Sequence, residues 1–278
     1  MVAPTVDVCL ISGARPELLS QTLDSFQSGL IKKLTVSKCI ANIDLFGGNE
    51  SQRQQCVALV LRHFRRAEVL TPPAPHFTAA VKRVWEKTSQ SIVLHLEDDW
   101  LLKEDLEPEA LVSKLNEKTR AVKFLFKEKN KDLQRDGKFD IDWIRRKFLG
   151  ITWHKKSYNR HSTSPGFFDG DFIREWAARM DLSLDPEKQA KPPFNPHLFE
   201  YVSRYQSELV MGPTQSELIV DIGRAWRHDH GVTKQTVGGA QRVEKQCRTI
   251  IAIIAIIAIS IANTVKCPTV PAAGCSPA

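Results

Sequence analysis

The sequence lacks the cysteine spacing of a metal-binding or redox protein. None of its six cysteines belongs to a C-x-x-C pair. The first three, Cys9, Cys39 and Cys56, lie inside apolar periodic segments, where a free thiol behaves as a small hydrophobic side chain. We therefore expect these cysteines to be structural.

The sequence also lacks a secretory leader and a long apolar run. MVAPTVDVCLISG leads directly into a strand-like segment without a basic start, so we expect a cytoplasmic protein, or one in the cytoplasm or nucleus of a virus-infected host cell. The apolar stretch 250–265, largely an IIA repeat, is shorter than the roughly 20 residues of a membrane-spanning helix. We expect a low-complexity, Ile-rich tail over 241–278; a tail anchor is the alternative.

Positive charge is concentrated in one segment. The chain has a formal net charge of +7, and residues 123–160 alone hold twelve Lys or Arg against five Asp or Glu, a surplus of 12 − 5 = 7. Basic groups attract phosphates and aromatic faces stack on bases, so this segment is typical of a nucleic-acid surface. The alternative is a solvated helix face with core aromatics. The interleaved aromatic residues are Phe139, Trp143, Phe148, Trp153 and Tyr158.

Strands alternate with helices over the first hundred residues. The apolar spacing predicts strands at 6–12, 36–48, 67–72 and 91–97, with helices within 13–29, 51–64 and 77–89. This alternation favours a mostly parallel sheet with helices on both faces. Ligands bind such sheets at the carboxyl ends of the strands.

The second half of the chain has a less regular pattern. It predicts a helix at 106–117, a strand at 121–129 and a Ser-Pro turn followed by a helix over 164–180. A further helix is expected from about Pro196, and a strand at 216–223.

Three adjacent acids, Glu97, Asp98 and Asp99, follow the apolar run SIVLHL. Carboxylates this close repel one another, so they need solvent, hydrogen-bond donors or a cation. Mg2+ or Mn2+ takes oxygen ligands, commonly only one or two from protein carboxylates. On an extended segment Glu97 and Asp99 face one side and Asp98 the other, which suits a metal that bridges a diphosphate. A general acid–base pair and a purely structural cluster are the alternatives.

The order of these motifs resembles the GT-A fold of nucleotide-sugar glycosyltransferases, particularly the family-2-like group. The first strand is followed by SGARPELLSQTLDSF, and the acids that end the fourth strand stand where this fold has its D-x-D signature. Over roughly residues 5–235, the resemblance implies an α/β fold with a Rossmann-like, mostly parallel sheet, helices on both faces and an acceptor-side extension. We expect a domain over 1–240, with a nucleotide-sugar half at about 5–105 and an acceptor half at about 106–235.

The resemblance also implies a UDP-sugar donor, an Mn2+ or Mg2+ cofactor and site residues. Asp99 is the principal expected metal ligand, with Glu97 as a further one. For a late ligand the sequence offers Asp221, with His228 and His230 as rivals. The residues implied to bind the nucleotide sugar are Ser12, Ala14, Arg15, Asp44, Lys82, Glu97, Asp98, Arg224 and Arg227.

An inverting enzyme of this kind needs a carboxylate that takes the proton of the acceptor hydroxyl. Glu200 is the first candidate, and Asp169 and Asp171 are the second. The basic segment lies where this fold builds its acceptor side. The residues expected there are Arg145, Arg146, Lys147, Trp153, Lys155, Lys156, Tyr158 and Arg160.

The basic segment favours DNA that carries a hydroxylated or hydroxymethylated base as the acceptor, or another polyanion. This loosely resembles the enzymes that glycosylate modified bases in viral and base J systems, and a base within a duplex has to be flipped out. One alternative is a polysaccharide or lipopolysaccharide glycosyltransferase in peripheral contact with an anionic membrane. The non-enzymatic alternative is a nucleic-acid binding module whose acids only order a loop.

Overall fold

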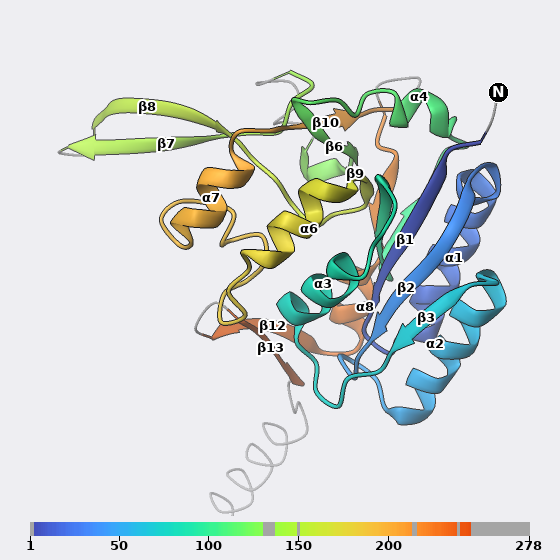
Figure 1. Cartoon of the computed structure of the whole chain (residues 1–278). Coiled ribbons are helices and arrows are strands. Elements are labelled where there is room, and N and C mark those ends of the chain that lie inside the picture. The colour runs from blue at the N-terminus through green and yellow to red at the C-terminus, as the bar shows by residue number, and fades with distance from the viewer. Residues whose placement is uncertain (1–2, 130–136, 149–150, 213–215, 238–239, 246–278) are drawn as a thin grey trace, which may run out of the picture.

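The computed structural model describes residues 3–129, 137–148, 151–212, 216–237 and 240–245. Strand β1 (Thr5–Ser12) is buried along nearly its whole length, which explains why it is apolar on both faces. Parallel strands β2 (Thr35–Ile43) and β4 (Ile92–Glu97) flank it. They form the middle of a seven-stranded sheet in the order β10-β6-β9-β4-β1-β2-β3 (Figure 1).

The sheet is mostly parallel, as the sequence predicts. Strand β3 (Ala67–Leu70) extends one edge beside β2, and β6 (Thr119–Phe124) pairs in parallel with β10 (Gln206–Val210) at the other. The exception is β9 (Gly166–Asp169), which runs antiparallel between β4 and β6. The helix expected directly after the Ser-Pro turn begins later than predicted, because Gly166–Asp169 form a short, largely buried strand that leads into it.

Helices cover both faces of the sheet (Figure 1). On one face α1 (Pro16–Gly29) and α2 (Glu50–His63) pack on alternate residues of the strands. On the other, α3 (Phe77–Glu86), α6 (Gly170–Ala178) and α7 (Pro196–Val202) enclose a second core. Cys9, Cys39 and Cys56 are buried free thiols within these cores, which confirms the structural prediction for them.

A small antiparallel sheet brings the late part of the chain to the acids after β4. It joins β5 (Trp100–Leu102) to β11 (Ile219–Asp221), and α8 (Gly223–Asp229) follows directly. The peptide N–H of Ile222 donates to the Asp99 carbonyl over 2.9 Å. Residues more than a hundred positions apart in the sequence, Asp99 and Ile222, therefore lie in contact after the end of β4.

Shorter elements complete the chain. They are the 3-10 turns Ile31–Lys33 and Lys127–Lys129, helix α4 (Pro108–Val112), and the hairpin of β12 (Val232–Val237) and β13 (Ala240–Lys245). Helix α4 is shorter than the expected 106–117, and the expected strand at 121–129 ends at Phe124. The predicted tail boundary at 240–241 falls at the start of β13, and the Ile-rich segment lies outside the described residues.

The basic segment forms an antiparallel hairpin of β7 (Ile141–Phe148) and β8 (Ile151–Asn159) that projects from the body (Figure 1). The alternative of a solvated helix face is therefore wrong. At the base of the hairpin the Tyr158 ring meets Phe199 edge-on at 5.3 Å, and the Asn159 amide donates to the Ser203 carbonyl over 3.0 Å. Within the residues that the structure describes, no helix is both long and apolar enough to cross a membrane.

Candidate active site

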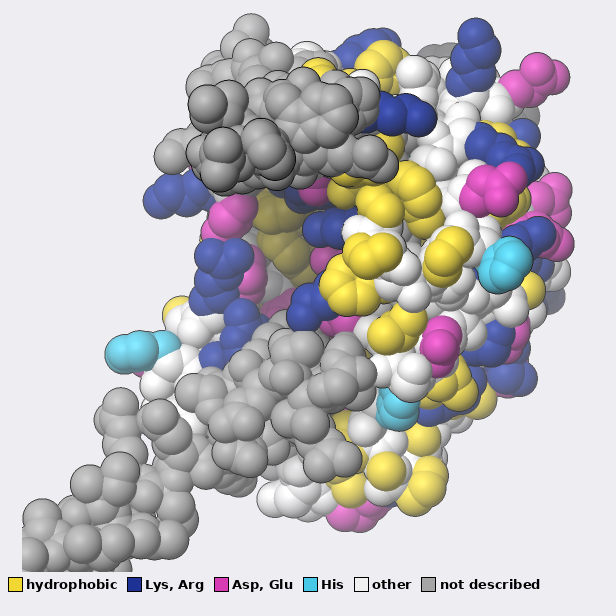
Figure 2. Space-filling model, turned by 90° about the vertical axis from the view of Figure 1, so that its left-hand side faces the viewer, with side chains coloured by type: hydrophobic (Ala, Val, Ile, Leu, Met, Phe, Trp, Pro, Cys, Tyr) yellow, Lys and Arg dark blue, Asp and Glu magenta, His cyan; other side chains and the backbone are white. Residues whose placement is uncertain are grey.

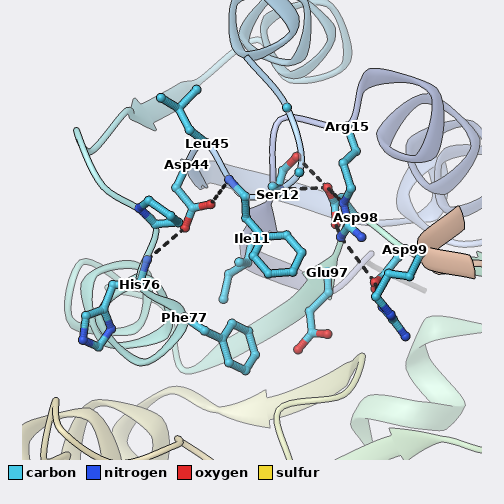
Figure 3. Close-up of a pocket in the computed structure, with 16 residues that line it drawn as sticks. Ile11, Ser12, Arg15, Asp44, Leu45, His76, Phe77, Glu97, Asp98 and Asp99 are labelled. Atoms are coloured by element: carbon cyan, nitrogen blue, oxygen red, sulfur yellow. Dashed lines mark hydrogen bonds and ion pairs between the residues drawn. The ribbon is translucent and has the colours of Figure 1, made fainter. Parts of the chain in front are cut away.

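A cavity of about 440 Å³ opens where β1, β2 and β4 end. Its wall consists of residues 11–13, Arg15, 44–48, 75–77, 97–99 and Arg227 (Figure 3). Parallel strands end at one edge, so the loops that follow them converge there. The structure thus brings together Ser12, Arg15, Asp44 and the three acids, all expected from the sequence to bind the nucleotide sugar or its metal.

Asp98 is held by hydrogen-bond donors of the protein, one of which is the charged Arg15. One oxygen accepts from the Ser12 hydroxyl at 2.8 Å, the Gly13 N–H at 2.9 Å and Arg15 Nε at 3.3 Å, and Arg15 Nη2 bonds the other. Burial acts to lower the pKa of Arg15, but Asp98 and Asp99 outweigh it and raise the pKa, so the guanidinium stays charged. This ion pair fixes the end of β4 against β1.

Asp99 faces Arg15 and a second group of charges that β11 and α8 contribute. Its Oδ2 lies 3.3 Å from Arg15 Nη2 and 3.6 Å from Arg227 Nη1. Asp221 Oδ2 lies 4.0 Å from Arg227 Nη2 and 2.9 Å from Arg224 Nε. Helix α8 approaches so closely that a Cβ at Gly223 would lie 2.2 Å from Asp99 Oδ2.

The donor set at Asp99 and Asp221 fits a hard divalent cation that completes its shell elsewhere. The two carboxylates converge on one guanidinium, and Mg2+ or Mn2+ commonly takes only one or two protein carboxylates, with water and phosphates as its other ligands. Among the described residues, no three His, Cys, Asp or Glu side chains are grouped to hold a metal by themselves. A cation here would therefore depend on ligands from a bound molecule.

The Glu97 carboxylate points away from the Arg15–Asp98 pair and toward Thr163 (Figure 3). Strand β4 ends at Glu97, and Asp98 and Asp99 form the turn to β5, so the extended geometry expected through Asp99 is wrong. The Glu97 carboxylate lies 3.1 Å from Thr163 Oγ1 and 3.4 Å from Trp100 Nε1.

One part of the cavity, called the Asp44 slot below, is lined by the loops that follow β2 and β3. Asp44 Oδ1 accepts from the Phe46 N–H at 3.0 Å, and Oδ2 lies 3.4 Å from the His76 N–H. Burial raises the pKa of Asp44 to about 6. Apolar side chains of Leu45 and Phe77 line the cavity with this carboxylate.

The other slot residues were missed by the sequence reasoning, although their place after strands was a usable signal. Gly48 fits only because it has no side chain: a Cβ would lie 2.0 Å from the Ala14 carbonyl oxygen. Ala14 itself is buried with a positive φ of 53°, and shapes the loop without lining the cavity. The missed lining residues are Leu45, Phe46, Gly47, Gly48, Pro75, His76 and Phe77.

Three expected ligand-binding residues lie elsewhere. Lys82 sits between α3 and α6, where its ammonium pairs with Glu86 at 2.8 Å and donates to the Ala177 carbonyl. Arg224 is 58% exposed and is shared between Asp221 and Glu128. The His228 side chain is 85% exposed beside Asp229, while its rival His230 stacks on Trp226 at 4.2 Å.

The three carboxylates expected to act as the base do not line the cavity. Because β9 is antiparallel, Asp169 pairs with Ile92 at the opposite end of β4 from Glu97. There it caps α6 and bonds Arg120 at 2.7 Å. Asp171 is exposed beside Arg174, and Glu200 is exposed on α7 beside Arg204.

A different carboxylate, Glu187, lies beside Glu97. Thr163 Oγ1 is 3.1 Å from both Glu97 Oε1 and Glu187 Oε1, and the Thr163 N–H donates to Glu187 over 3.0 Å. Lys123 is fully buried nearby, where burial lowers its pKa to about 7 although Glu187 and Glu97 act to raise it. Glu187 comes from the irregular segment between α6 and α7, which gave no periodic signal.

The expected acceptor-binding residues are only partly placed. The side chains of Arg145, Arg146, Lys147, Trp153 and Lys155 lie outside the described part of the chain. Lys156 is exposed, Tyr158 packs on Phe199, and Arg160 lies 3.4 Å from Asp140. Lys129 also pairs with Asp140, at 2.7 Å, and both are buried. Part of the positive charge of the segment is therefore used in a buried ion pair.

Solved structures share this architecture at low sequence identity. A mannosyltransferase from Pyrobaculum calidifontis, in complex with GDP-Man and Mn2+, is 11% identical with a TM-score of 0.53, over 82% of this chain and 61% of that one. Glucosyl-3-phosphoglycerate synthase from Mycobacterium tuberculosis with Mg2+ and UDP is 16% identical with a TM-score of 0.45, over 74% and 69%. The same synthase with Mn2+, UDP and phosphoglyceric acid is 18% identical with a TM-score of 0.38, over 61% and 57%.

No protein-family model matches the sequence, and no curated protein sequence matches it. The chain spans about three fifths of the length of the mannosyltransferase and of the synthase in its complex with phosphoglyceric acid. The likeness to the mannosyltransferase confirms the predicted GT-A fold, an α/β architecture with a mostly parallel sheet between helices.

Proposed function

We propose that the protein is a glycosyltransferase that moves a sugar from a nucleoside diphosphate sugar to an acceptor hydroxyl. The observation that carries the proposal is the cavity that brings together Asp44, the Arg15–Asp98 pair, Asp99 and Arg227. Asp221 joins this group through Arg227, whose Nη2 lies 4.0 Å from its Oδ2. A nucleoside diphosphate offers an N–H of its base to Asp44 and its phosphates to the arginines and to a cation at Asp99. The complex of the Pyrobaculum mannosyltransferase with GDP-Man and Mn2+ supports this class of donor.

The chain's own groups account for donor binding and for departure of the diphosphate. Asp44, which lines the cavity, would accept an N–H of the base, such as that of uracil in a UDP-sugar. Arg15 and Arg227 face the diphosphate, where negative charge grows as the bond to the sugar breaks. When bound, Mn2+ or Mg2+ at Asp99 and Asp221 supplies further positive charge to this leaving group.

Glu187 replaces Glu200, Asp169 and Asp171 as the proposed base. The acceptor oxygen bonds to the anomeric carbon, the carbon–oxygen bond to the diphosphate breaks, and the acceptor proton passes to the Glu187 carboxylate. Thr163 holds this carboxylate beside Glu97, and Glu97 itself lines the cavity. Two carboxylates that share one hydroxyl are well placed to orient an acceptor hydroxyl.

A thermal-shift panel of nucleoside diphosphates and nucleotide sugars, with and without Mn2+, tests the donor site. A ligand present at 100 times its Kd stabilises the folded protein by about 2.7 kcal/mol, so a matching donor raises the melting temperature by several degrees. The shift should vanish in Asp99→Asn and persist in Asp171→Asn, whose carboxylate is 87% exposed on α6. If no nucleotide shifts the wild-type protein in either condition, the proposal fails.

For the acceptor, we propose DNA with a hydroxylated or hydroxymethylated base. The projecting basic hairpin β7–β8 supports it, and on the face seen in Figure 2 Lys and Arg side chains meet Asp and Glu around a hollow. Salt-dependent retention on duplex DNA, but not on anionic vesicles, is the expected result. Retention on vesicles alone would favour the polysaccharide or lipopolysaccharide alternative at a membrane surface, and DNA retention without any nucleotide binding would favour a non-enzymatic module.

A further inference from the structure

Arg227 lies where the proposed function needs a metal ion. Its Nη1 is 3.6 Å from Asp99 Oδ2, and its Nη2 is 4.0 Å from Asp221 Oδ2. The side chain is only 16% exposed. One guanidinium thus supplies positive charge to both carboxylates that would hold the cation.

The two arginines at the acids differ in how firmly they are held. Charge-assisted N–H···O bonds normally span about 2.7–2.9 Å. Arg15 bonds Asp98 through two nitrogens in a fully buried pair. Both contacts of Arg227 are longer than a hydrogen bond, so its attraction is mainly electrostatic and the side chain is free to exchange one partner for another.

The backbone that carries Arg227 is fixed independently of any ligand. The Trp226 indole is buried and donates to Glu17 of α1 over 2.9 Å. The start of α8 is tied to the acids by the Ile222 N–H, which donates to the Asp99 carbonyl. Helix α8 therefore presents the Arg227 side chain to the cavity before a donor arrives.

We propose that Arg227 is a built-in counter-cation that holds Asp99 and Asp221 until the donor binds, and then contacts the diphosphate while the divalent cation takes the carboxylates. The inference rests on the proposed function. It means that Mn2+ alone competes with a resident positive charge and binds weakly, whereas Mn2+ and a nucleoside diphosphate each strengthen binding of the other. Such coupling is reciprocal and typically 5- to 150-fold.

The test is a titration of the full chain with Mn2+ alone, with free Mn2+ followed by electron paramagnetic resonance. We expect Arg227→Gln to bind Mn2+ about tenfold more tightly than wild type without nucleotide, and to bind UDP in saturating Mn2+ about tenfold more weakly. Arg227→Lys keeps the charge and should resemble wild type in the Mn2+ titration. Arg204→Gln, which removes one charge from an exposed pair on α7, is the matched control for net charge. Adding Asp99→Asn to Arg227→Gln should abolish the gain.

Equal or weaker Mn2+ binding by Arg227→Gln, or UDP binding equal to wild type, would overturn the inference. So would the absence of Mn2+ binding in both proteins. Failure of the proposed function has a different signature, because the wild-type protein would then bind no nucleoside diphosphate under any condition, whatever the Mn2+ titrations show. Thermal unfolding of each variant establishes that it is folded.

Discussion

The proposed donor side and the proposed acceptor side of the site are built differently. On the donor side, Asp44 follows β2 and Asp98 follows β4, and both carboxylates accept hydrogen bonds from backbone N–H groups. On the acceptor side, Thr163 and Glu187 come from irregular segments and share one hydrogen-bonded cluster with Glu97. Removing the partner of a buried, hydrogen-bonded polar group lowers stability. Segments outside regular secondary structure, in contrast, can vary in sequence without loss of the fold. In the proposed function, stability and donor binding therefore depend on one side, and acceptor chemistry depends on the other.

The largest effect is expected on the acceptor side, in Glu187→Gln. General-base catalysis typically contributes 10²–10⁴-fold, so we expect turnover to fall by about that factor while donor affinity stays within about twofold. Initial rates with a saturating donor, together with calorimetric titration of the nucleotide, separate the two quantities.

Glu200→Gln is the matched control for Glu187→Gln, because Glu200 is exposed on α7 and paired only with Arg204 among the bonds described for it. Turnover there should fall by less than about tenfold. A larger loss at Glu200 than at Glu187 would reverse the assignment and move the base away from the Thr163 cluster.

On the donor side, the expected cost of Asp98→Ala is mainly one of stability. The change leaves the buried Arg15 guanidinium without its main partner, and breaking a buried ion pair in this way costs about 3–5 kcal/mol. Urea unfolding measures the fall in the free energy of unfolding. Asp171→Ala, on an exposed pair, should cost less than about 1 kcal/mol; if the two variants were equally stable, the donor side would not be the rigid one.

The donor side could be predicted from the sequence because its information is local. Periodic apolar residues fix the first four strands, and the end of each strand fixes which loop reaches the edge, so Ser12, Arg15, Asp44 and Asp99 follow directly. The pattern could not predict which groups contact each acid. Asp98 uses hydrogen-bond donors and Asp99 faces arginines, and only the approach of α1 and α8 decides this.

The acceptor side could not be predicted because its information is not local. Strand β9 is four residues long and continues into a helix, so the sequence pattern does not reveal that it runs antiparallel. This direction places Asp169 beside Ile92, at the end of β4 opposite to Glu97. Glu187 lies in a segment without apolar spacing, and reaches Glu97 only through Thr163. An acid at the end of a regular helix, such as Glu200, is more conspicuous in a sequence than one in a loop.

The pH dependence of the free energy of unfolding tests the buried Asp44 carboxylate on the donor side. Burial raises the pKa of Asp44 to about 6, so the folded state binds a proton more readily than the unfolded chain. This favours folding below about pH 4, and the benefit is lost as the pH rises to about 6. Asp44→Asn should remove that slope and be more stable than wild type by about 2–3 kcal/mol at pH 7, with equal stability at pH 3.5. It should also bind UDP about tenfold more weakly, because the base loses a carboxylate acceptor. Urea unfolding at both pH values provides the check, and a wild-type protein without this slope would contradict the origin given for the shift.

The smallest effect is expected at Lys82, which the resemblance placed at the phosphates and the structure places between α3 and α6. Its ammonium pairs with Glu86 and donates to the Ala177 carbonyl, and the side chain is 24% exposed. Partly exposed pairs of this kind contribute about 0.2–1 kcal/mol, so Lys82→Met should lower the free energy of unfolding by no more than about 1 kcal/mol. Its UDP affinity in Mn2+ should match that of wild type, because no phosphate contact is removed. A marked loss of affinity with unchanged stability would show that α3 moves toward the donor when it binds, and the donor side would then be less rigid than its hydrogen bonds imply.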